Sequence, residues 1–316
     1  MEGFVIGADI GGTFTRVAVC NLTGAVLGSA VGGPGNPNSV GLDGSAGQIR
    51  HTILEACADA GLTAASLGAV RKVVIGLAGG SRAADTAGFL RAAVPSEVQV
   101  APALVSDLAV AFCSATPATE GYVLVAGTGA VAGRVVGDDL CERRDGWGWL
   151  LGDDGSGFWL GRAAVRATLA GLEQNQVLGP LGAAVLELAG CADHVELLRA
   201  CYSRPPAWLA QFATLVSQHA ATDPAAARIA AEAVRLLRGT LMSLEPCPHQ
   251  PVVLAGSVLT QPGPVSDSFR AKIERELPNP ILTSGSGLVG ALWMGLRGLG
   301  SAPTLHPRLA RDGRLE

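Results

Sequence analysis

The chain begins with three apolar runs that are separated by short turns. Residues 3–9, 15–20 and 25–31 are rich in Val, Ile and Ala, whereas the segments between them contain Gly11-Gly12 and Asn21-Leu22-Thr23-Gly24. Short apolar runs bounded by turn residues are typical of β-strands. The pattern therefore predicts a three-stranded β-meander at the start of the chain.

A loop rich in glycine and proline follows from Gly32 to Asn38, and after it helical and strand patterns alternate. The prolines exclude a regular helix or a central strand in this loop. Beyond it, stretches rich in Ala, Leu and Ile have helical spacing, and runs typical of buried strands lie between them. The sequence predicts helices at about 40–60, 82–93 and 108–116, with strands at Val70–Leu77 and Val98–Val105.

The same pattern starts again near Glu120. Tyr122–Ala126 predicts a strand, Gly127-Thr128-Gly129 a turn, and Val131–Val136 a second strand before the turn Gly137-Asp138-Asp139. Both halves thus share the order strand, glycine turn, strand, polar turn, strand. This order indicates an internal repeat.

Helical patterns dominate the rest of the chain. They cover about 156–245 and are followed by a strand over Val252–Ser257 and by helices near 265–277 and 287–298. The last residues contain Pro303, Pro307 and Gly313 and predict a frayed tail.

Length and composition limit the class of protein. The chain has 316 residues, of which 48% are hydrophobic, so it can bury one large core or two medium ones, and two is the expected number. No signal peptide precedes the first strand and no stretch of about 18 apolar residues occurs, which predicts a cytoplasmic protein with no membrane contact. The net charge of −4, without a stripe rich in Lys and Arg, argues against nucleic acid as a partner.

The cysteines and histidines show no metal-binding spacing. The seven cysteines include no C-x-x-C pair, and no histidine lies three or four residues from another His. A single His–Cys pair, Cys191 and His194, has a spacing of three. We therefore expect buried free thiols and no zinc site.

The first glycine turn carries candidate chemistry. Gly11 and Gly12 have no Cβ, so backbone N–H groups can approach an anion there, and Thr13 adds a hydroxyl donor. The carboxylate of Asp9 beside this turn is explained if it holds the hydrated Mg²⁺ that accompanies bound phosphates. The turn indicates nucleotide binding, although this fragment alone also fits an ordinary hairpin.

The second glycine turn matches a dinucleotide-binding fingerprint that we reject. The run from Gly127 to Ala132 fits G-x-G-x-x-A, with Asp145 near the distance of a ribose-binding acid. That motif requires a helix directly after the glycines, whereas here β-type residues lead to a Gly-Asp-Asp turn. A second phosphate hairpin is the better interpretation, because two such hairpins can grip one polyphosphate from two sides.

With these two hairpins the chain resembles the superfamily of sugar kinases, heat-shock chaperones and actin. Within it, the chain is similar to the BadF/BadG-type ATPases, a group that includes the N-acetylglucosamine kinases. The resemblance covers nearly the whole chain, and the run Gly146–Gly157 is its most specific part. The motifs that carry it are Asp9–Thr13, Gly35–Asn38, Val105–Asp107, Gly127–Gly129, Gly146–Gly157 and Leu254–Val258.

The resemblance implies an α/β fold made of duplicated ribonuclease-H-like (actin-like ATPase) domains. Each domain is expected to be a mixed five-stranded sheet with helices, with a cleft between the two domains. The implied N-terminal domain is 1–118 joined by the last helix 287–299, the C-terminal domain is 119–286, and 300–316 is a tail.

The resemblance also implies an ATP-dependent kinase that uses Mg²⁺ and phosphorylates N-acetylglucosamine at the 6-hydroxyl. Its implied partner is this small-molecule sugar, and relatives are often homodimers. Asp107 is the implied base that accepts the proton of the attacking hydroxyl. The position of Asp107 between a strand and a helix also fits a helix N-cap.

The other site residues follow from the same resemblance, with Asp9 binding Mg²⁺ through water. Those implied to contact ATP are Gly11, Gly12, Thr13, Gly127, Thr128, Gly129, Gly256 and Ser257. Those implied to contact the sugar are Asn36, Asp107, Thr128, Gly146, Trp147 and Asp153. Stabilisation of the following helix is an alternative for Asp153 and Asp154, turn capping is expected for Asn38, and core packing for Trp149.

Two residues depart from the pattern of similar kinases. Phe14 stands where relatives commonly carry Lys, and it is expected to point away from the phosphate turn. Ala130 stands where they commonly carry Ser, and it lacks a hydroxyl near the amino-sugar substituent. Glucosamine, another hexosamine or glucose therefore remain alternative substrates.

Three other functions fit the sequence less well. An ATPase activator of the BadF type needs clustered cysteines for an iron–sulfur cluster, and the sequence has no such pair. A sugar-responsive repressor needs a helix-turn-helix segment ahead of the first strand. A nucleotide-binding scaffold without turnover is disfavoured by the presence of Asp107.

Overall fold

The computed structural model describes residues 3–77 and 86–315, and the chain divides into two compact units. Unit 1 comprises Met1–Gly121, Val135–Cys141 and Leu282–Glu316. Unit 2 comprises Tyr122–Arg134 and Glu142–Ile281. The chain therefore passes from unit 1 to unit 2 after the first repeat and returns to unit 1 for its last helices.

Unit 1 is built on a mixed five-stranded sheet with the strand order β3-β2-β1-β4-β5. The first three strands pair antiparallel, as expected for a meander, whereas β1 pairs parallel with β4 and β4 with β5. The strands are β1 (Phe4–Ile10), β2 (Thr15–Asn21), β3 (Val26–Gly32), β4 (Val70–Leu77) and β5 (Ala103–Ser106).

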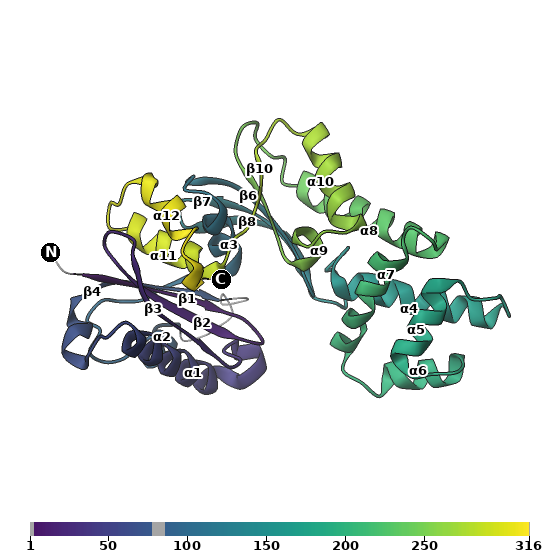
Figure 1. The fold of residues 1–316 in the computed structure, drawn as a ribbon, viewed down its shortest axis with the longest axis horizontal. Coiled ribbons are helices and arrows are strands. Elements are labelled where there is room, and N and C mark those ends of the chain that lie inside the picture. Colours follow the sequence, from purple (N-terminus) through teal and green to yellow (C-terminus); the bar gives the residue numbers. More distant parts are fainter. Residues whose placement is uncertain (1–2, 78–85, 316) are drawn as a thin grey trace. The chain divides into compact units, whose positions relative to one another are not determined.

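Helices cover both faces of this sheet (Figure 1). Helices α1 (Pro37–Asp59) and α2 (Thr86–Ala93) lie on one face, and α3 (Asp107–Ala115) and α11 (Gly287–Arg297) lie on the other. Helix α11 packs closely against α3 because Gly290 has no side chain: a Cβ there would overlap the carbonyl oxygen of Val110. The last long helix of the sequence thus completes the core of unit 1.

Most of the second sheet lies in unit 2, and its strand order is β10-β9-β6-β7-β8. Read from β8, the order matches that of unit 1, and the parallel pair β6 and β9 corresponds to β1 and β4. The strands are β6 (Glu120–Ala126), β7 (Ala130–Val136), β8 (Asp139–Asp145), β9 (Val252–Ala255) and β10 (Ile281–Thr283). The prediction of a duplicated α/β fold with two mixed five-stranded sheets is confirmed.

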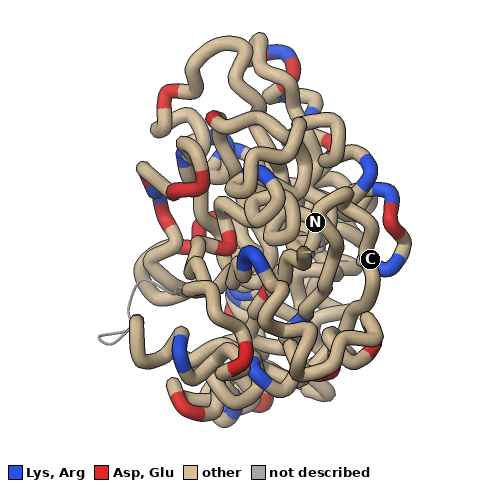
Figure 2. Tube along the Cα trace, turned by 90° about the vertical axis from the view of Figure 1, so that its left-hand side faces the viewer, with Lys and Arg blue, Asp and Glu red and all other residues tan. Residues whose placement is uncertain are grey.

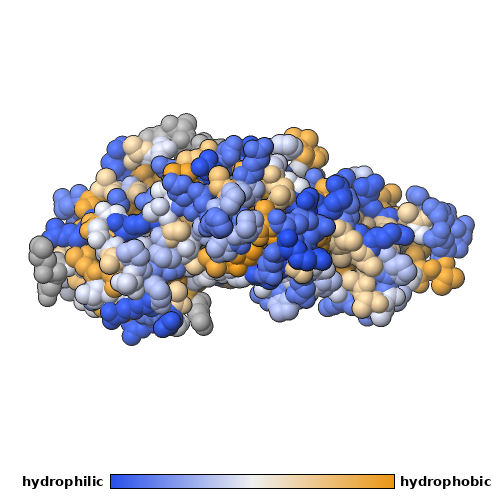
Figure 3. Space-filling view, turned by 90° about the horizontal axis from the view of Figure 1, so that it is seen from above, coloured by the Kyte–Doolittle hydropathy of each residue, from blue (hydrophilic) through white to orange (hydrophobic). Residues whose placement is uncertain are grey.

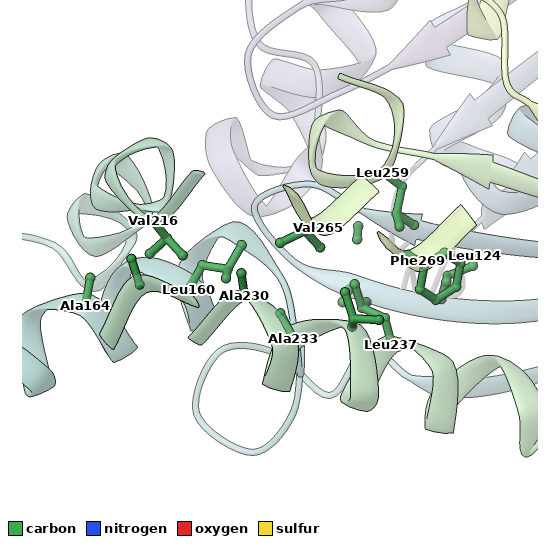
Figure 4. Packing of buried hydrophobic residues seen from close by; sticks show 14 of the residues in the cluster. Leu124, Leu160, Ala164, Val216, Ala230, Ala233, Leu237, Leu259, Val265 and Phe269 are labelled. Carbon is green, nitrogen blue, oxygen red and sulfur yellow. The ribbon is translucent and has the colours of Figure 1, made fainter. Parts of the chain in front are cut away.

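The core of unit 2 joins this sheet to a large helical region. Figure 4 shows Leu124 of β6 beside Phe269 and Leu237, while Leu160 and Val216 extend the same apolar cluster among the helices. The helices are α4 (Gly157–Glu173), α5 (Pro180–Ala189), α6 (His194–Tyr202), α7 (Ala213–His219), α8 (Pro224–Met242), α9 (Ser257–Thr260) and α10 (Pro264–Glu276).

Some boundaries differ from the sequence-based expectation. The predicted strand over Val98–Val105 is only β5, because Pro102 has no N–H for the ladder and the strand begins after it. Of the predicted helix 82–93, residues 82–85 lie outside the described residues and the rest is α2. Strand β10 was not predicted, since three residues give no periodic signal.

The prediction of a frayed tail is wrong. The segment after α11 contains the short helix α12 (His306–Leu309), and His306, Leu309 and Leu315 are buried. Arg314 donates hydrogen bonds to the carbonyl oxygens of Val26 and Leu27 at the start of β3. Burial of apolar side chains and these bonds outweigh the helix-breaking prolines, so the tail is a packed part of unit 1.

The surface is mixed in charge and hydropathy. Acidic and basic residues are interspersed along the trace (Figure 2), and hydrophobic patches alternate with hydrophilic residues on the face drawn in Figure 3. Among the residues that the structure describes, no helix has the length and apolar character needed to cross a bilayer.

Buried His306 makes the stability of unit 1 sensitive to acid. Its Nε2 lies 2.8 Å from the carbonyl oxygen of Cys113, and its ring packs edge-on against Trp293. Because a carbonyl only accepts, Nε2 carries the proton of the neutral ring. Burial lowers the pKa of His306 from its usual 6.5, with a smaller lowering effect from Arg297. The unfolded chain therefore binds a proton more readily than the folded protein does.

We expect the free energy of unfolding to fall as the pH drops below about 6.5, since protonation then favours the unfolded state. Substitution His306→Gln keeps a hydrogen-bond donor but does not titrate, so it should remove part of this pH dependence. Urea unfolding between pH 8 and pH 5 measures the effect, with His194→Gln on exposed α6 as the control. Equal pH dependence in the wild type and His306→Gln would contradict the prediction.

Candidate active site

The first glycine turn joins β1 to β2 and also anchors the loop that contains Asn36. The N–H of Gly11 donates to the carbonyl oxygen of Phe14 at 2.9 Å, which closes the turn. The carbonyl oxygen of Gly11 accepts from the N–H of Asn36 at 3.2 Å, and Asn36 is buried. The predicted phosphate turn and the predicted sugar loop are therefore in direct contact, while Gly12 and Thr13 are exposed.

Asp9 lies near the end of β1, opposite Arg16 on β2. Burial raises the pKa of Asp9; the Arg16 guanidinium opposes this shift, and the negative charge of Asp107 adds to it. Helix α11 reaches the same place, because a Cβ on Gly287 would overlap the Asp9 carboxylate. Gly287 thus packs directly against the predicted metal ligand.

Asp107 is the first residue of α3, immediately after β5. The helix N-cap is Ser106, whose Oγ accepts from the N–H of Leu108 at 3.2 Å, so the alternative assignment of Asp107 as the N-cap is wrong. The Ser106 hydroxyl also lies 3.3 Å from Oδ1 of Asp107, to which it can donate. Since β1, β4 and β5 run parallel, Asp9 and Asp107 both lie at the carboxyl edge of the sheet.

The second glycine turn, Gly127–Gly129, receives the N-terminus of α4. The N–H of Gly157 donates to the carbonyl oxygen of Gly127 at 2.7 Å, and the N–H of Phe158 donates to that of Thr128 at 3.1 Å. These bonds satisfy two of the helix donors that otherwise lack partners. The side chain of Thr128 is exposed.

Asp153 contacts this turn through its carboxylate. A Cβ on Gly129 would lie 2.8 Å from Oδ2 of Asp153, and the carboxylate accepts backbone N–H groups of Ala130 and Gly148. Burial nevertheless raises the pKa of Asp153. The N-cap of α4 is Ser156, whose Oγ accepts from Trp159 N, so capping of this helix is not the role of the Asp153 carboxylate.

Gly256 fixes the same turn from the side of β9. Its φ is +82°, in the region that favours glycine, and a Cβ there would overlap the carbonyl oxygen of Ala126. That Cβ would also lie 2.8 Å from the N–H nitrogen of Gly127. The predicted adenosine-side glycine is therefore required by close backbone packing within unit 2.

A cavity of about 350 Å³ opens beside the second glycine turn and includes three predicted ATP contacts, Gly127, Thr128 and Ser257. Its lining combines apolar side chains with hydroxyl and amide groups, and both kinds of group occur in small-molecule sites. Most of its lining could not be predicted from the sequence, because these residues belong to no motif. The additional lining includes Leu160, Ala213, Thr214, Ser217, Gln218, Gln261 and Val265.

The loop after β8 holds the remaining predicted sugar contacts. Gly146 accepts a hydrogen bond from Arg143 at its carbonyl oxygen, whereas the side chain of Trp147 is 72% exposed. Trp149, expected to pack in the core, lies 5.6 Å from the Phe158 ring but remains 48% exposed. Within unit 2, Asp153 thus lies against the second glycine turn, while most of the Trp147 side chain is exposed to solvent.

Both departures from the family pattern lie next to these turns. Phe14 is 46% exposed, and its ring centre lies 5.1 Å from the guanidinium of Arg16, within the range of a cation–π contact. Ala130 is buried, and its N–H donates to Asp153. The position that lacks a hydroxyl is thus directly beside a predicted sugar-binding acid.

Comparison with known proteins assigns the chain to a family. The model of the BadF/BadG/BcrA/BcrD ATPase family matches residues 6–295, so the protein belongs to this family of ATPases. The resemblance expected from the sequence is confirmed.

Two relatives have names that include a sugar. The chain is 26% identical over 285 residues to the N-acetylmuramic acid/N-acetylglucosamine kinase of Clostridium acetobutylicum, covering 87% of this chain and 92% of that protein. It is 28% identical over 185 residues to the N-acetyl-D-glucosamine kinase of Dictyostelium discoideum, covering 55% of this chain and 58% of that protein.

Solved structures are similar over most of the chain. A protein of Chromobacterium violaceum assigned provisionally as an N-acetylglucosamine kinase has a TM-score of 0.72 and 27% identity, covering 92% of this chain and 98% of that one. A ROK family glucokinase from Streptomyces griseus has a TM-score of 0.54 and 19% identity, covering 94% and 100%. The similarity to the glucokinase shows a shared fold and no more.

Proposed function

We propose that this protein is a sugar kinase that transfers the γ-phosphoryl group of ATP to the 6-hydroxyl of N-acetylglucosamine. The observation that carries the proposal is the carboxyl edge of the first sheet. Asp9 and Asp107 lie there next to a glycine turn whose Gly11 carbonyl holds Asn36. In this proposal the edge supplies a metal ligand, a base, an anion-binding turn and a sugar-binding amide. The names of both relatives support N-acetylglucosamine as the acceptor.

Asp107 is assigned as the base. Its carboxylate accepts the proton of the sugar hydroxyl and orients that oxygen toward the γ-phosphorus. A carboxylate is a weak base, but phosphoryl transfer has a loose transition state, so positioning supplies most of the rate. The Ser106 hydroxyl and the start of α3 hold Asp107 in place for this role.

Asp9 is assigned to Mg²⁺. The described residues contain no group of three or more His, Cys, Asp or Glu side chains that could hold a metal by themselves. One carboxylate together with phosphate oxygens and water suffices for Mg²⁺. Burial and, less strongly, the charge of Asp107 raise the pKa of Asp9, and a bound cation would favour its charged form. When bound, Mg²⁺ neutralises charge on the phosphates. The N–H groups of Gly12 and Thr13 and the Thr13 hydroxyl are assigned to phosphate oxygens.

The cavity in unit 2 is assigned to the adenosine part of ATP. Leu160, Ala213 and Val265 offer apolar surface for a flat base, while Gln218 and Gln261 offer amide groups for its polar edge. The second glycine turn and Ser257 at the cavity wall are assigned to the ribose and phosphates. Gly256 contributes by placing that turn.

Asn36, Gly146, Trp147 and Asp153 are assigned to the sugar. Each sugar hydroxyl loses water on binding and needs a hydrogen-bond partner, which an amide and a carboxylate provide. Because Ala130 lacks the hydroxyl of similar kinases, glucosamine and other hexoses are the alternative acceptors. A homodimer, a cytoplasmic location and domain boundaries at 118 and 286 stay predictions from the resemblance.

Phosphorylation of a sugar panel tests the proposal. Purified protein with Mg²⁺ and ATP is incubated with N-acetylglucosamine, glucosamine, N-acetylmannosamine, glucose and 6-deoxy-N-acetylglucosamine, and products are identified by mass spectrometry and phosphorus NMR. We expect N-acetylglucosamine 6-phosphate and no product from the 6-deoxy sugar. A phosphate on the 6-deoxy sugar would refute the position, and no product from any sugar would refute the function.

A further inference from the structure

One carboxylate closes the loop that carries the predicted sugar contacts of unit 2, residues 146–155. Asp145, the last residue of β8, accepts the N–H of Asp153 at Oδ1 with a distance of 2.8 Å. Its Oδ2 accepts the N–H of Asp154 at 2.9 Å. The two ends of the loop are thereby joined by two hydrogen bonds to a single charged group, which are stronger than bonds between neutral groups.

Neighbouring residues restrict the position of both the side chain and the main chain of Asp145. A Cβ on Gly152 would overlap Oδ1 of Asp145, so the loop backbone lies directly against the carboxylate. Arg143 donates from Nε to the carbonyl oxygen of Asp145 at 3.3 Å and from Nη2 to that of Gly146. Side chain and main chain of Asp145 are therefore both fixed.

The conformation of Asp145 carries a cost that the hydrogen bonds offset. Its φ is +59°, a left-handed conformation that is unfavourable for an ordinary residue and costs glycine almost nothing. A glycine would adopt this backbone but would leave the two N–H groups without the carboxylate. Asp145 thus holds the loop by hydrogen bonds that a glycine at this position could not make.

Asp153 transmits the constraint to the glycine turn. Its φ of +58° is also left-handed, and its carboxylate accepts the N–H groups of Ala130 and Gly148. The backbone of Asp153 is held by Asp145, while the side chain of Asp153 lies against Gly129. A shift of the loop backbone therefore moves the Asp153 carboxylate relative to the turn.

We propose that Asp145 is a positioning residue for sugar binding, which fixes Asp153 and the Gly146 segment in the geometry that receives the acceptor sugar. The inference rests on the proposed function, because it takes the sugar contacts of Asp153 from it. Asp145 itself does not contact the sugar. Its contribution is to the affinity for sugar and not to the affinity for ATP.

Two substitutions test this role. Asp145→Asn keeps the size and the tolerance of a left-handed backbone but offers one acceptor oxygen in place of two. Asp145→Gly removes both acceptor oxygens. Because glycine adopts a left-handed backbone readily, this variant introduces no backbone strain that would prevent folding. Asp139→Asn, at the exposed start of the same strand β8, is the matched control.

We expect both Asp145 variants to raise the KM for N-acetylglucosamine at least tenfold, with the KM for ATP within twofold of the wild type and kcat within threefold. Hydrogen exchange of peptides covering residues 146–155 should become faster in these variants. Asp139→Asn should match the wild type in both measurements. A merely structural role would lower the thermal midpoint without separating the two KM values.

An unchanged sugar KM in both Asp145 variants, with a wild type that phosphorylates N-acetylglucosamine, would overturn this inference alone. The same holds if the KM for ATP rises as much as the KM for sugar. A wild type inactive on every sugar would instead overturn the proposed function and this inference with it. The two failures are therefore distinguishable.

Discussion

Replacement of Asp107 by Asn is expected to lower kcat for sugar phosphorylation by about 10²–10⁴-fold, the range of general-base catalysis. The amide has nearly the same shape but cannot accept the proton of the hydroxyl. Binding of Mg²⁺ and ATP should persist, because loss of the negative charge removes an influence that raises the pKa of Asp9. Steady-state kinetics with N-acetylglucosamine and calorimetric titration with Mg²⁺ and ATP measure the two effects separately.

Glu187→Gln provides the matched loss of one carboxylate on the exposed surface of α5 and should leave kcat unchanged. Slow hydrolysis of ATP in the absence of sugar should survive in Asp107→Asn, since water is then the acceptor. If Asp107→Asn phosphorylates the sugar at the wild-type rate, Asp107 is not the base.

Substitution Gly256→Ala is expected to destabilise the protein by about 3 kcal/mol. The new Cβ would meet the carbonyl oxygen of Ala126, and the φ of +82° is unfavourable for alanine. The second glycine turn would have to move, so ATP binding should weaken together with stability. Urea unfolding and ATP titration of the folded fraction measure the two consequences.

Gly239→Ala is the control for this substitution. Gly239 lies within α8, and apart from its chain neighbours and the backbone of its own helix no described heavy atom lies within 4 Å of the position of its Cβ. Alanine is the better helix former there and should stabilise the protein by about 0.5–1 kcal/mol. Equal unfolding midpoints of Gly256→Ala and the wild type would show that the contact with Ala126 relaxes at no cost.

Much of the fold could be predicted because its strands are apolar runs bounded by glycine or proline. The ends of β4 agree with the prediction, since Val70–Leu77 is a continuous buried run. The predicted strand is longer than β5 because Val98 and Val100 fit a strand pattern, whereas Pro102 interrupts the hydrogen-bond ladder. The tail was mispredicted because its burial depends on contacts with β3 that are distant in sequence.

Part of the candidate site could likewise be predicted from the sequence, and part could not. The resemblance to the family predicts that Asp9 and Asp107 belong to one site. The structure gives the physical reason, since the parallel strands β1, β4 and β5 bring both residues to one edge of the sheet. The lining of the cavity by α7 and α10 could not, because Ala213, Ser217 and Val265 belong to no motif. The sequence suggests a role for Asp145 only within the rejected dinucleotide fingerprint. Its hydrogen bonds to Asp153 and Asp154 depend on a left-handed backbone conformation that the local sequence does not specify.

The carbonyl of Gly11, which holds Asn36, has a consequence for how two substrates influence each other. If nucleotide phosphates displace the turn, this bond transmits the displacement to the neighbouring loop. A sugar bound at Asn36, as proposed, would displace the turn in the same way. Free-energy coupling between two ligands is necessarily mutual. Whatever factor ATP imposes on sugar affinity, the sugar must impose on ATP, and a single main-chain oxygen is a direct route for that exchange.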